Sequence, residues 1–187
     1  MGLDPGGDRL QLPCLTTDRL RLRPWRPLAD AAAALQIYGD PQVVAHLGPG
    51  SKPDTIATVQ RRLQRYYQVY HPPAPWGCWA VEEPTQAQVI GHILLIPLAD
   101  RHHQPSHRPE IGWHFRPSHW GQGYATEAAA AVLHHGLHHW QMPAIYGVIA
   151  PHHDRSRRLA LRLGMVDLGL TRHYYGGREL SLFRYSV

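Results

Sequence analysis

The sequence predicts an α/β fold of the α+β type, in which one mixed sheet has helices interspersed between its strands. From Arg19 to Arg23, charged and apolar side chains alternate strictly, which is typical of a strand with one buried face. From Pro53 to Tyr70, apolar residues recur at helical spacing. The period then changes, and the residues from Trp76 to Leu98 indicate two strands joined as a hairpin. We find no internal repeat and no boundary of a second domain.

The same periodicities, and the turn residues between them, place the remaining elements. Strands are expected at residues 19–23, 76–82, 88–98, 110–115, 144–150, 166–171 and 179–185. Helices are expected at residues 28–38, 42–47 and 53–70, from a Gly-rich turn to about 140, and at 154–163. A His-rich segment, 101–108, is predicted to be a loop, and the Pro-rich segment 72–75 is predicted to end the third helix.

The chain of 187 residues is long enough for one domain with a sizeable core. We expect residues 1–12 to form a flexible tail and residues 13–187 to form that domain. No apolar run approaches the roughly 18 residues that cross a membrane. The first residues also lack the basic-then-apolar order of a signal peptide. We therefore expect a cytoplasmic protein with no membrane partner.

The formal net charge of +5 suggests an anionic partner. Nearly all of the positive charge is arginine, gathered in helical patterns that are typical of solvated faces. No aromatic platform or nucleic-acid motif accompanies it, so nucleic-acid binding is not expected, whereas a polyanionic cofactor would use the same charge. The two cysteines, Cys14 and Cys78, form no metal or redox motif.

A Gly-rich turn from Trp120 to Thr126 lies between a predicted strand and the long helix. Helix N-termini expose unpaired N–H groups and a partial positive charge, which together bind phosphate oxygens. Gly121 and Gly123 allow the backbone to approach an anion closely. The turn could also merely join strand to helix. The glycine spacing fits neither a Rossmann fingerprint nor the phosphate-binding loop of NTPases.

The residues from Glu110 to Pro117, followed by Trp120 to Ala128, resemble the acetyl-CoA motif of the GNAT superfamily. The form Trp-Gly-x-Gly-Tyr-Ala-Thr-Glu-Ala is similar to the RimJ/RimL branch, the ribosomal-protein N-terminal acetyltransferases and their relatives. The opening strand near Leu15–Trp25, the Leu163-Gly164-Met165 segment and Gly177–Leu180 are also similar to that branch.

This resemblance implies a mixed, mostly antiparallel sheet that splays between its fourth and fifth strands, here 110–115 and 144–150. It implies acetyl-CoA as cosubstrate, with the pantetheine arm in the splay and the pyrophosphate at the Gly-rich turn. The cofactor-binding residues so implied are Trp113, His114 and Phe115, then Gly121, Gln122, Gly123, Tyr124, Ala125 and Thr126, and finally His153 and Ser156. His153 stands where the branch usually has asparagine.

The catalytic candidates are Glu110, Glu179 and Ser156. Glu110 begins the central strand, where related enzymes often carry a glutamate that acts as a base through water. Glu179, at the start of the last strand, is the alternative base. Many GNAT enzymes use a tyrosine as the acid, but Ala160 occupies its place here. The branch has a serine near the CoA sulfur, at Ser156, although a small residue there could serve packing alone.

Fifteen histidines raise the question of a metal. His134 with His138, and His135 with His139, have chelating spacing, but the apolar stripe of the helix places all four on the solvated face. No metal is therefore expected.

The resemblance thus implies direct transfer of an acetyl group to a primary amine, first of all the N-terminal α-amine of a protein or peptide. The acceptor is expected to enter near Trp25, His46, Tyr174 and Tyr175. A small amine, amino acid or antibiotic as acceptor stays open, as does a non-catalytic acyl-CoA-binding module. A homodimer is possible, and RNA would be met only through ribosomal proteins.

Overall fold

The computed structural model describes residues 12–48, 51–70 and 75–186. Most of the predicted tail, and part of the Pro-rich segment at 72–75, lie outside these residues. Leu12 was assigned to the tail, but it is buried in the core, so the tail prediction was wrong at this residue. Within the described residues, no helix is both long and apolar enough to cross a membrane.

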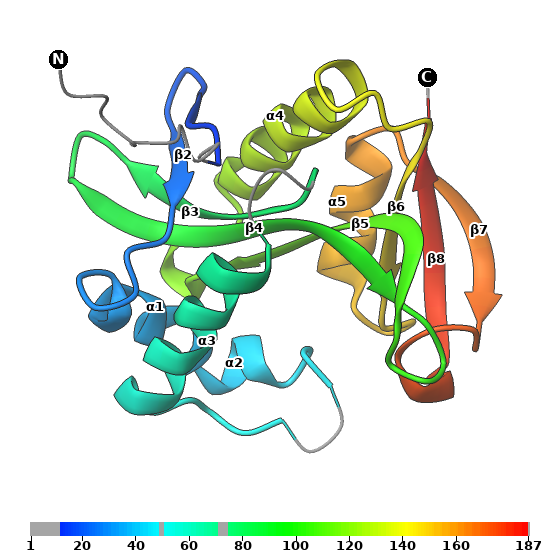
Figure 1. The fold of residues 1–187 in the computed structure, drawn as a ribbon, viewed down its shortest axis with the longest axis horizontal. Helices are drawn as coiled ribbons and strands as arrows, with labels where there is room; N and C mark the ends of the chain where they lie inside the picture. Colours follow the sequence, from blue (N-terminus) through cyan, green and yellow to red (C-terminus); the bar gives the residue numbers. More distant parts are fainter. Residues whose placement is uncertain (1–11, 49–50, 71–74, 187) are drawn as a thin grey trace, which may run out of the picture.

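In the described part of the chain, eight strands form one sheet in the order β1-β2-β3-β4-β5-β6-β8-β7 (Figure 1). Their bounds are β1 Leu15–Thr16, β2 Arg21–Pro24, β3 Gly77–Glu83, β4 Gln88–Ala99, β5 Pro105–Phe115, β6 Ile145–Ile149, β7 Val166–Thr171 and β8 Leu180–Tyr185. Strands β5 and β6 pair in parallel, and the other neighbours described are antiparallel. The predicted mixed, mostly antiparallel sheet is confirmed.

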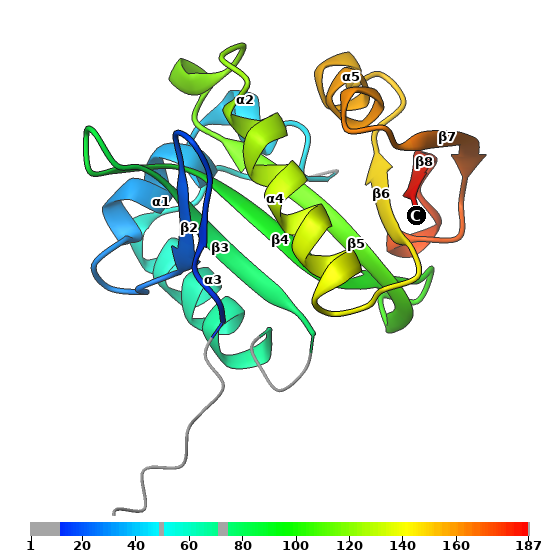
Figure 2. The same cartoon turned by 90° about the horizontal axis from the view of Figure 1, so that it is seen from above.

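The sheet opens between β5 and β6. These two strands are paired at a single position, Glu110 with Tyr146. Figure 2 shows that they then run in different directions, with β6, β8 and β7 forming a separate wing of the sheet. Backbone groups of the diverging segments are left without a strand partner on that side, and they are free to bind another extended chain.

Helices cover both faces of the sheet, and the alternation of side chains along the strands divides the core between them. Their bounds are α1 Ala31–Tyr38, α2 Pro41–Val44, α3 Ile56–Val69, α4 Tyr124–His138 and α5 Asp154–Arg162, with 3₁₀ turns η1 Pro117–His119 and η2 Tyr175–Gly177. Ile93 and Leu95 of β4 pack in the cluster that includes α4. Leu94 and Ile96 face the opposite way and pack against the cluster of α1 and α3. Figures 1 and 2 show these helices on opposite sides of the sheet.

Local chemistry sets the ends of several helices. α3 begins after Thr55, not at Pro53, because Thr55 and Thr58 form a reciprocal capping box. α1 begins after Asp30, whose carboxylate accepts the backbone N–H of Arg26 at 2.7 Å, so the expected start at residue 28 was too early. The carboxylate also accepts two bonds from Arg23, at 2.6 and 2.9 Å, which ties β2 to α1.

Two predictions of the histidine-rich segments were wrong. The expected loop at 101–108 is shorter, because β5 begins at Pro105 and pairs with β4 as far as Ala99. Proline is unusual within a strand, so Pro105 and Pro109 argued against a strand here. A register shift between Pro97 and Ala99 accommodates them. On α4, His134, His138 and His139 are exposed as expected. His135 is half-buried against Trp140, with ring centroids 4.7 Å apart.

Candidate active site

A cavity of about 390 Å³ occupies the opening between β5 and β6. It is lined by Gly112 to Phe115 of β5, by Val148 to Ala150 at the end of β6, and by residues of α1, α2, α3, α5 and η2. At one end, Trp120 and Ala125 bring it to the Gly-rich turn and the start of α4. We call this part the turn end. At the other, Tyr38, Tyr66, Glu110 and Tyr175 form what we call the tyrosine wall.

At the turn end, glycine is required by the backbone itself. Gly121 has φ of 77° and Gly123 has φ of 82°, in the left-handed region that other residues rarely adopt. Gly123 caps α4, and the first helical bond runs from Glu127 N–H to the Gly123 carbonyl. The N–H groups of Gly123 through Thr126 therefore have no partner within the helix. Unpaired N–H groups of this kind suit an anion, and the predicted anion site at the helix start stays a prediction.

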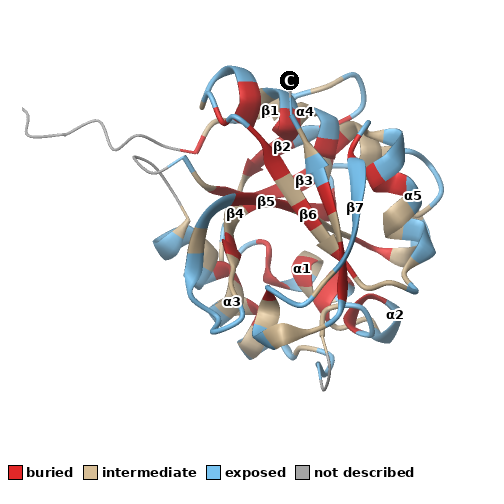
Figure 3. Cartoon of the chain, turned by 90° about the vertical axis from the view of Figure 1, so that its right-hand side faces the viewer, coloured by how far each residue is buried: buried red, intermediate tan, exposed pale blue. Residues whose placement is uncertain are grey.

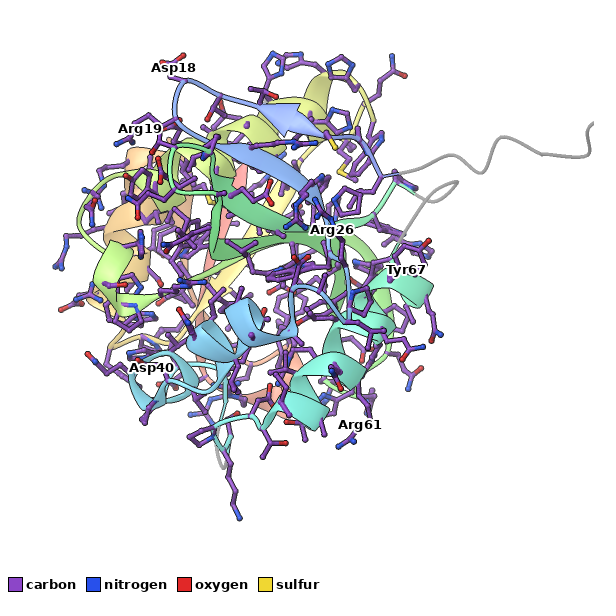
Figure 4. All side chains as sticks on the ribbon, turned by 90° about the vertical axis from the view of Figure 1, so that its left-hand side faces the viewer. Asp18, Arg19, Arg26, Asp40, Arg61 and Tyr67 are labelled. Carbon is purple, nitrogen blue, oxygen red and sulfur yellow. The ribbon has the colours of Figure 1, made fainter. Side chains whose placement is uncertain are left out.

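Arg19 holds this turn against the β1–β2 connection, and no local sequence pattern marks this interaction. Its guanidinium pairs with Glu127 at 2.6 Å and donates to the Gln122 carbonyl at 3.1 Å. It also lies 4.6 Å from the centre of the Tyr124 ring. Burial raises the pKa of Glu127, but hydrogen bonds from Thr17 and Arg19 outweigh it, and the net pKa is lowered. Figure 4 shows Arg19 beside Asp18 at the end of the β1–β2 connection.

On the tyrosine wall, Glu110 is 6% exposed and accepts a short hydrogen bond from the hydroxyl of Tyr175. Burial raises the pKa of Glu110 to about 7, although the bond from Tyr175 acts in the opposite direction. A carboxyl group with this pKa can accept and release a proton near neutral pH. Tyr175 belongs to η2 and lies 65 residues after Glu110 in the chain, so only the fold brings the pair together.

Ser156 lies where the helical stripe predicted, on the inner side of α5 above buried Leu159 and Ala160. Its hydroxyl oxygen accepts a hydrogen bond from the Trp113 indole at 3.3 Å. This contact crosses the open region from β5 to α5. Because the oxygen is the acceptor, the hydroxyl proton is left for another partner in the cavity.

Glu179 lies outside the cavity lining, with a half-exposed side chain that accepts a bond from Arg172 at 2.8 Å. Glu110 is thus the carboxylate that lines the cavity in the described part of the chain. The two predicted bases occupy different environments, one enclosed and one solvated.

The expected acceptor entrance was half wrong. His46 and Tyr175 line the cavity, but Trp25 and Tyr174 do not. Trp25 is buried and donates from its indole to Nδ1 of His92 at 2.9 Å. Tyr174 is buried too, and its hydroxyl accepts from Arg108. Nothing in the sequence around Trp25 or Tyr174 indicates that their side chains lie in the core and not in the cavity.

Two histidines in the cavity are held neutral. Burial lowers the pKa of His114 to about 4, with further contributions from Arg62 and His153. Burial likewise lowers the pKa of His153 to about 4, helped by His46, whose ring stacks on it with centroids 3.6 Å apart. His153 is therefore a neutral donor or acceptor beside the cavity, and with His46 it links α5 to the segment after α2.

Three arginines also line the cavity. Two of them, Arg62 and Arg155, belong to the clusters that were predicted to lie on solvated faces. Arg155 lies 4.0 Å from the centre of the Trp120 ring, at the turn end. Arg62 lies over the Tyr38 ring of the tyrosine wall, and Arg178 lies beside the segment after α2, where it donates to the Leu47 carbonyl. No group of three or more His, Cys, Asp or Glu suited to a metal ion occurs among the described residues.

A family model described as an acetyltransferase (GNAT) domain matches residues 19–166. The chain is 28% identical over 162 residues to the uncharacterized N-acetyltransferase YoaA of Bacillus subtilis, covering 87% of this chain and 88% of that protein. It is 30% identical over 154 residues to the uncharacterized protein YkkB of the same organism, covering 81% and 84% respectively.

Solved structures share the fold. A GNAT-family acetyltransferase from Bacillus anthracis superposes with a TM-score of 0.74 at 22% identity, covering 94% of this chain and 98% of that one. A ribosomal-protein-S5-alanine acetyltransferase from Vibrio fischeri superposes with a TM-score of 0.74 at 15% identity, covering 93% of this chain and 96% of that one. With a matching family model over most of its length and an open sheet of the expected kind, this chain belongs to the GNAT family of acyl-CoA-dependent acetyltransferases.

Proposed function

We propose that the protein is an N-acetyltransferase of the RimJ/RimL kind, which transfers an acetyl group from acetyl-CoA directly to the N-terminal α-amine of a protein or peptide. The observation that carries the proposal is Glu110, a buried carboxyl with a pKa near 7 in a cavity that extends to the start of α4. Ribosomal-protein acetyltransferases among the structural neighbours favour this acceptor class.

The residues present fit acetyl-CoA. Left-handed Gly121 and Gly123 give the backbone close access to a pyrophosphate, and N–H groups from Gln122 to Thr126 would hold it. Backbone groups of Trp113 and Phe115 would hold the pantetheine arm in the open region, whereas those of His114 face its β4 partner His92. Trp120 already donates to the Phe115 carbonyl at 2.8 Å, so that residue would contribute its N–H group. Bound there, acetyl-CoA supplies an activated acyl thioester.

Glu110 is the proposed base. An α-amine has a pKa of about 8, so a carboxylate with a pKa near 7 can remove its proton directly or through one water. The hydroxyl of Tyr175 fixes the orientation of the carboxylate. Glu179 is solvated and already paired with Arg172, so we assign it no proton transfer.

Ser156 is the proposed donor toward the departing sulfur. Its oxygen accepts from the Trp113 indole, which orients the hydroxyl while leaving its proton available. Buried Ala160 replaces the tyrosine that many relatives use, so Ser156 takes over a task that otherwise falls to a phenol. His153, neutral and in the cavity, is the proposed polar partner of the pantetheine arm in place of asparagine.

The test is incubation with acetyl-CoA and a panel of N-terminal peptides and small amines, following both free CoA and acceptor mass. We expect an acetylated peptide α-amine. Acetylation of only small amines or antibiotics would overturn the assigned acceptor but keep the chemistry. Binding of acetyl-CoA without turnover on any amine would favour a non-catalytic acyl-CoA-binding module instead.

A further inference from the structure

The charges that line the cavity are unbalanced. Among the described lining residues there are three arginines, Arg62, Arg155 and Arg178, but a single carboxyl group, that of Glu110. Because burial raises the pKa of Glu110 to about 7, even this carboxyl is only partly ionised at neutral pH. The cavity therefore presents positive charge to whatever enters it.

The three arginines differ in what already satisfies them. Arg62 is paired with Asp54, which accepts from both Nε and Nη2 at 2.8 Å, and it also lies over the Tyr38 ring. Arg155 stacks on Trp120, the first residue of the Gly-rich turn, so it belongs to the turn end, where a phosphate group would meet it. Neither needs an acceptor molecule to account for its position.

Arg178 has no such partner. Its one described hydrogen bond runs from Nη1 to the Leu47 carbonyl and is long, at 3.5 Å. No ion pair of Arg178 occurs within the described residues, although its side chain is only half-exposed and lines the cavity. Its Nη1 lies close to Gly48, where an added Cβ would be 3.2 Å away. A guanidinium in this position has free donors for a planar anion.

Arg178 lines the same cavity as Glu110. It follows η2, the turn that carries Tyr175, and Tyr175 bonds to Glu110. An amine beside Glu110 and an anionic group beside Arg178 would therefore lie in the same cavity. The opposite arrangement, a polycationic acceptor, would place extra ammonium groups next to uncompensated guanidinium, which costs affinity.

We propose that the acceptor carries a carboxylate close to its reactive amine and that Arg178 binds this carboxylate. This inference rests on the proposed function, acetyl transfer to an amine. Two sources would supply it: the α-carboxylate of a free amino acid, or an acidic side chain near the N-terminus of a peptide. The inference excludes aminoglycosides and polyamines, whose additional charges are positive.

The test uses matched acceptor pairs that differ in one charge. One arm compares free amino acids with their carboxamides, and the other compares C-terminally amidated tetrapeptides that have Glu or Gln at the second position. We expect the carboxylate member to have a kcat/KM about 10- to 100-fold higher, mostly through KM, as charge-assisted hydrogen bonds give. The arm that shows the difference identifies the source.

Variants assign the effect. Arg178→Ala should bring the ratio within each pair close to one, Arg178→Lys should keep part of it, and Arg178→Glu should reverse it. Arg172→Ala is the matched control, because Arg172 is on the same connection but is 72% exposed and pairs with Glu179 outside the cavity. Thermal melting of each variant verifies that it is folded.

A wild-type ratio near one, or a ratio that survives in Arg178→Ala, would overturn the inference while acetylation itself persists. If no amine is acetylated, the proposed function fails, and calorimetric titration of the same pairs into the CoA-bound protein still decides the inference. Equal affinity of both members would then refute it, and tighter binding of the carboxylate member, lost in Arg178→Ala, would support it.

Discussion

The two ends of the cavity are built in different ways. The turn end uses backbone N–H groups of one continuous segment, with two left-handed glycines and the start of α4. The tyrosine wall uses side chains from α1, α3, β5 and η2, which are far apart in the chain. The turn end therefore depends on local backbone geometry, and the tyrosine wall depends on side chains that only the fold brings together.

The largest effect that would sharpen this contrast is expected at Glu110. In Glu110→Gln the amide cannot take a proton, so we expect kcat to fall about 10²- to 10⁴-fold, with little change in the KM for acetyl-CoA. Steady-state kinetics measure both. Glu179→Gln is the control, because its carboxylate is solvated and paired with Arg172. An equal loss in both variants would remove the special role of the tyrosine wall.

The next effect concerns the turn end. Gly123→Ala places a Cβ on a residue with φ of 82°, 3.3 Å from the Arg19 guanidinium, and we expect a loss of about 1–2 kcal/mol in unfolding free energy. The KM for acetyl-CoA should rise about tenfold if this loss falls on binding. Denaturant unfolding and kinetics measure the two quantities.

Gly169→Ala is the control for backbone strain alone. Gly169 has φ of 86° but has open space around it and lies in β7, away from the cavity. Figure 3 shows β7 as an exposed edge strand. The Gly169→Ala variant should lose a similar amount of unfolding free energy and keep the wild-type KM for acetyl-CoA. If both variants raise the KM equally, general destabilisation explains the effect and the turn end has no local role.

A smaller effect is expected at Arg19. Its pair with Glu127 is partly exposed, so Arg19→Ala should change the free energy of unfolding by only about 0–1 kcal/mol. The KM for acetyl-CoA should still rise a few-fold, because the guanidinium holds the Gln122 carbonyl and the Tyr124 ring. Arg21→Ala, a neighbouring exposed arginine 4.0 Å from Glu82, should leave the KM unchanged.

The turn end and the tyrosine wall also differ in how far they could be predicted from the sequence. The periodicity of apolar residues and the Gly-rich turn are local signals, so most helices and strands, and the glycine turn at the start of α4, were predictable. The pairing of Tyr175 with Glu110 and of Arg19 with Glu127 joins segments far apart in sequence. No local pattern marks such pairs, and only the fold reveals them.

Aromatic residues illustrate the limit. Trp25 and Tyr174 were expected at the acceptor entrance, but each satisfies its polar atom inside the core. Large amphipathic side chains suit a core and a binding site equally well. Arg178 shows the reverse, since an arginine in a loop is usually solvated, and its place in the cavity depends on how η2 packs against the segment after α2.

The pH dependence of kcat/KM, compared between the wild type and Glu110→Gln, tests the central claim most directly. Burial raises the pKa of Glu110 from 4.5 to about 7, so the base form appears as pH rises. The same shift makes the folded protein bind more protons than the unfolded chain between these values, so stability falls as pH rises through this window. We predict that wild-type activity rises through about pH 7 and that this inflection is absent in Glu110→Gln. The same inflection in both proteins would contradict the assignment of Glu110 as the base.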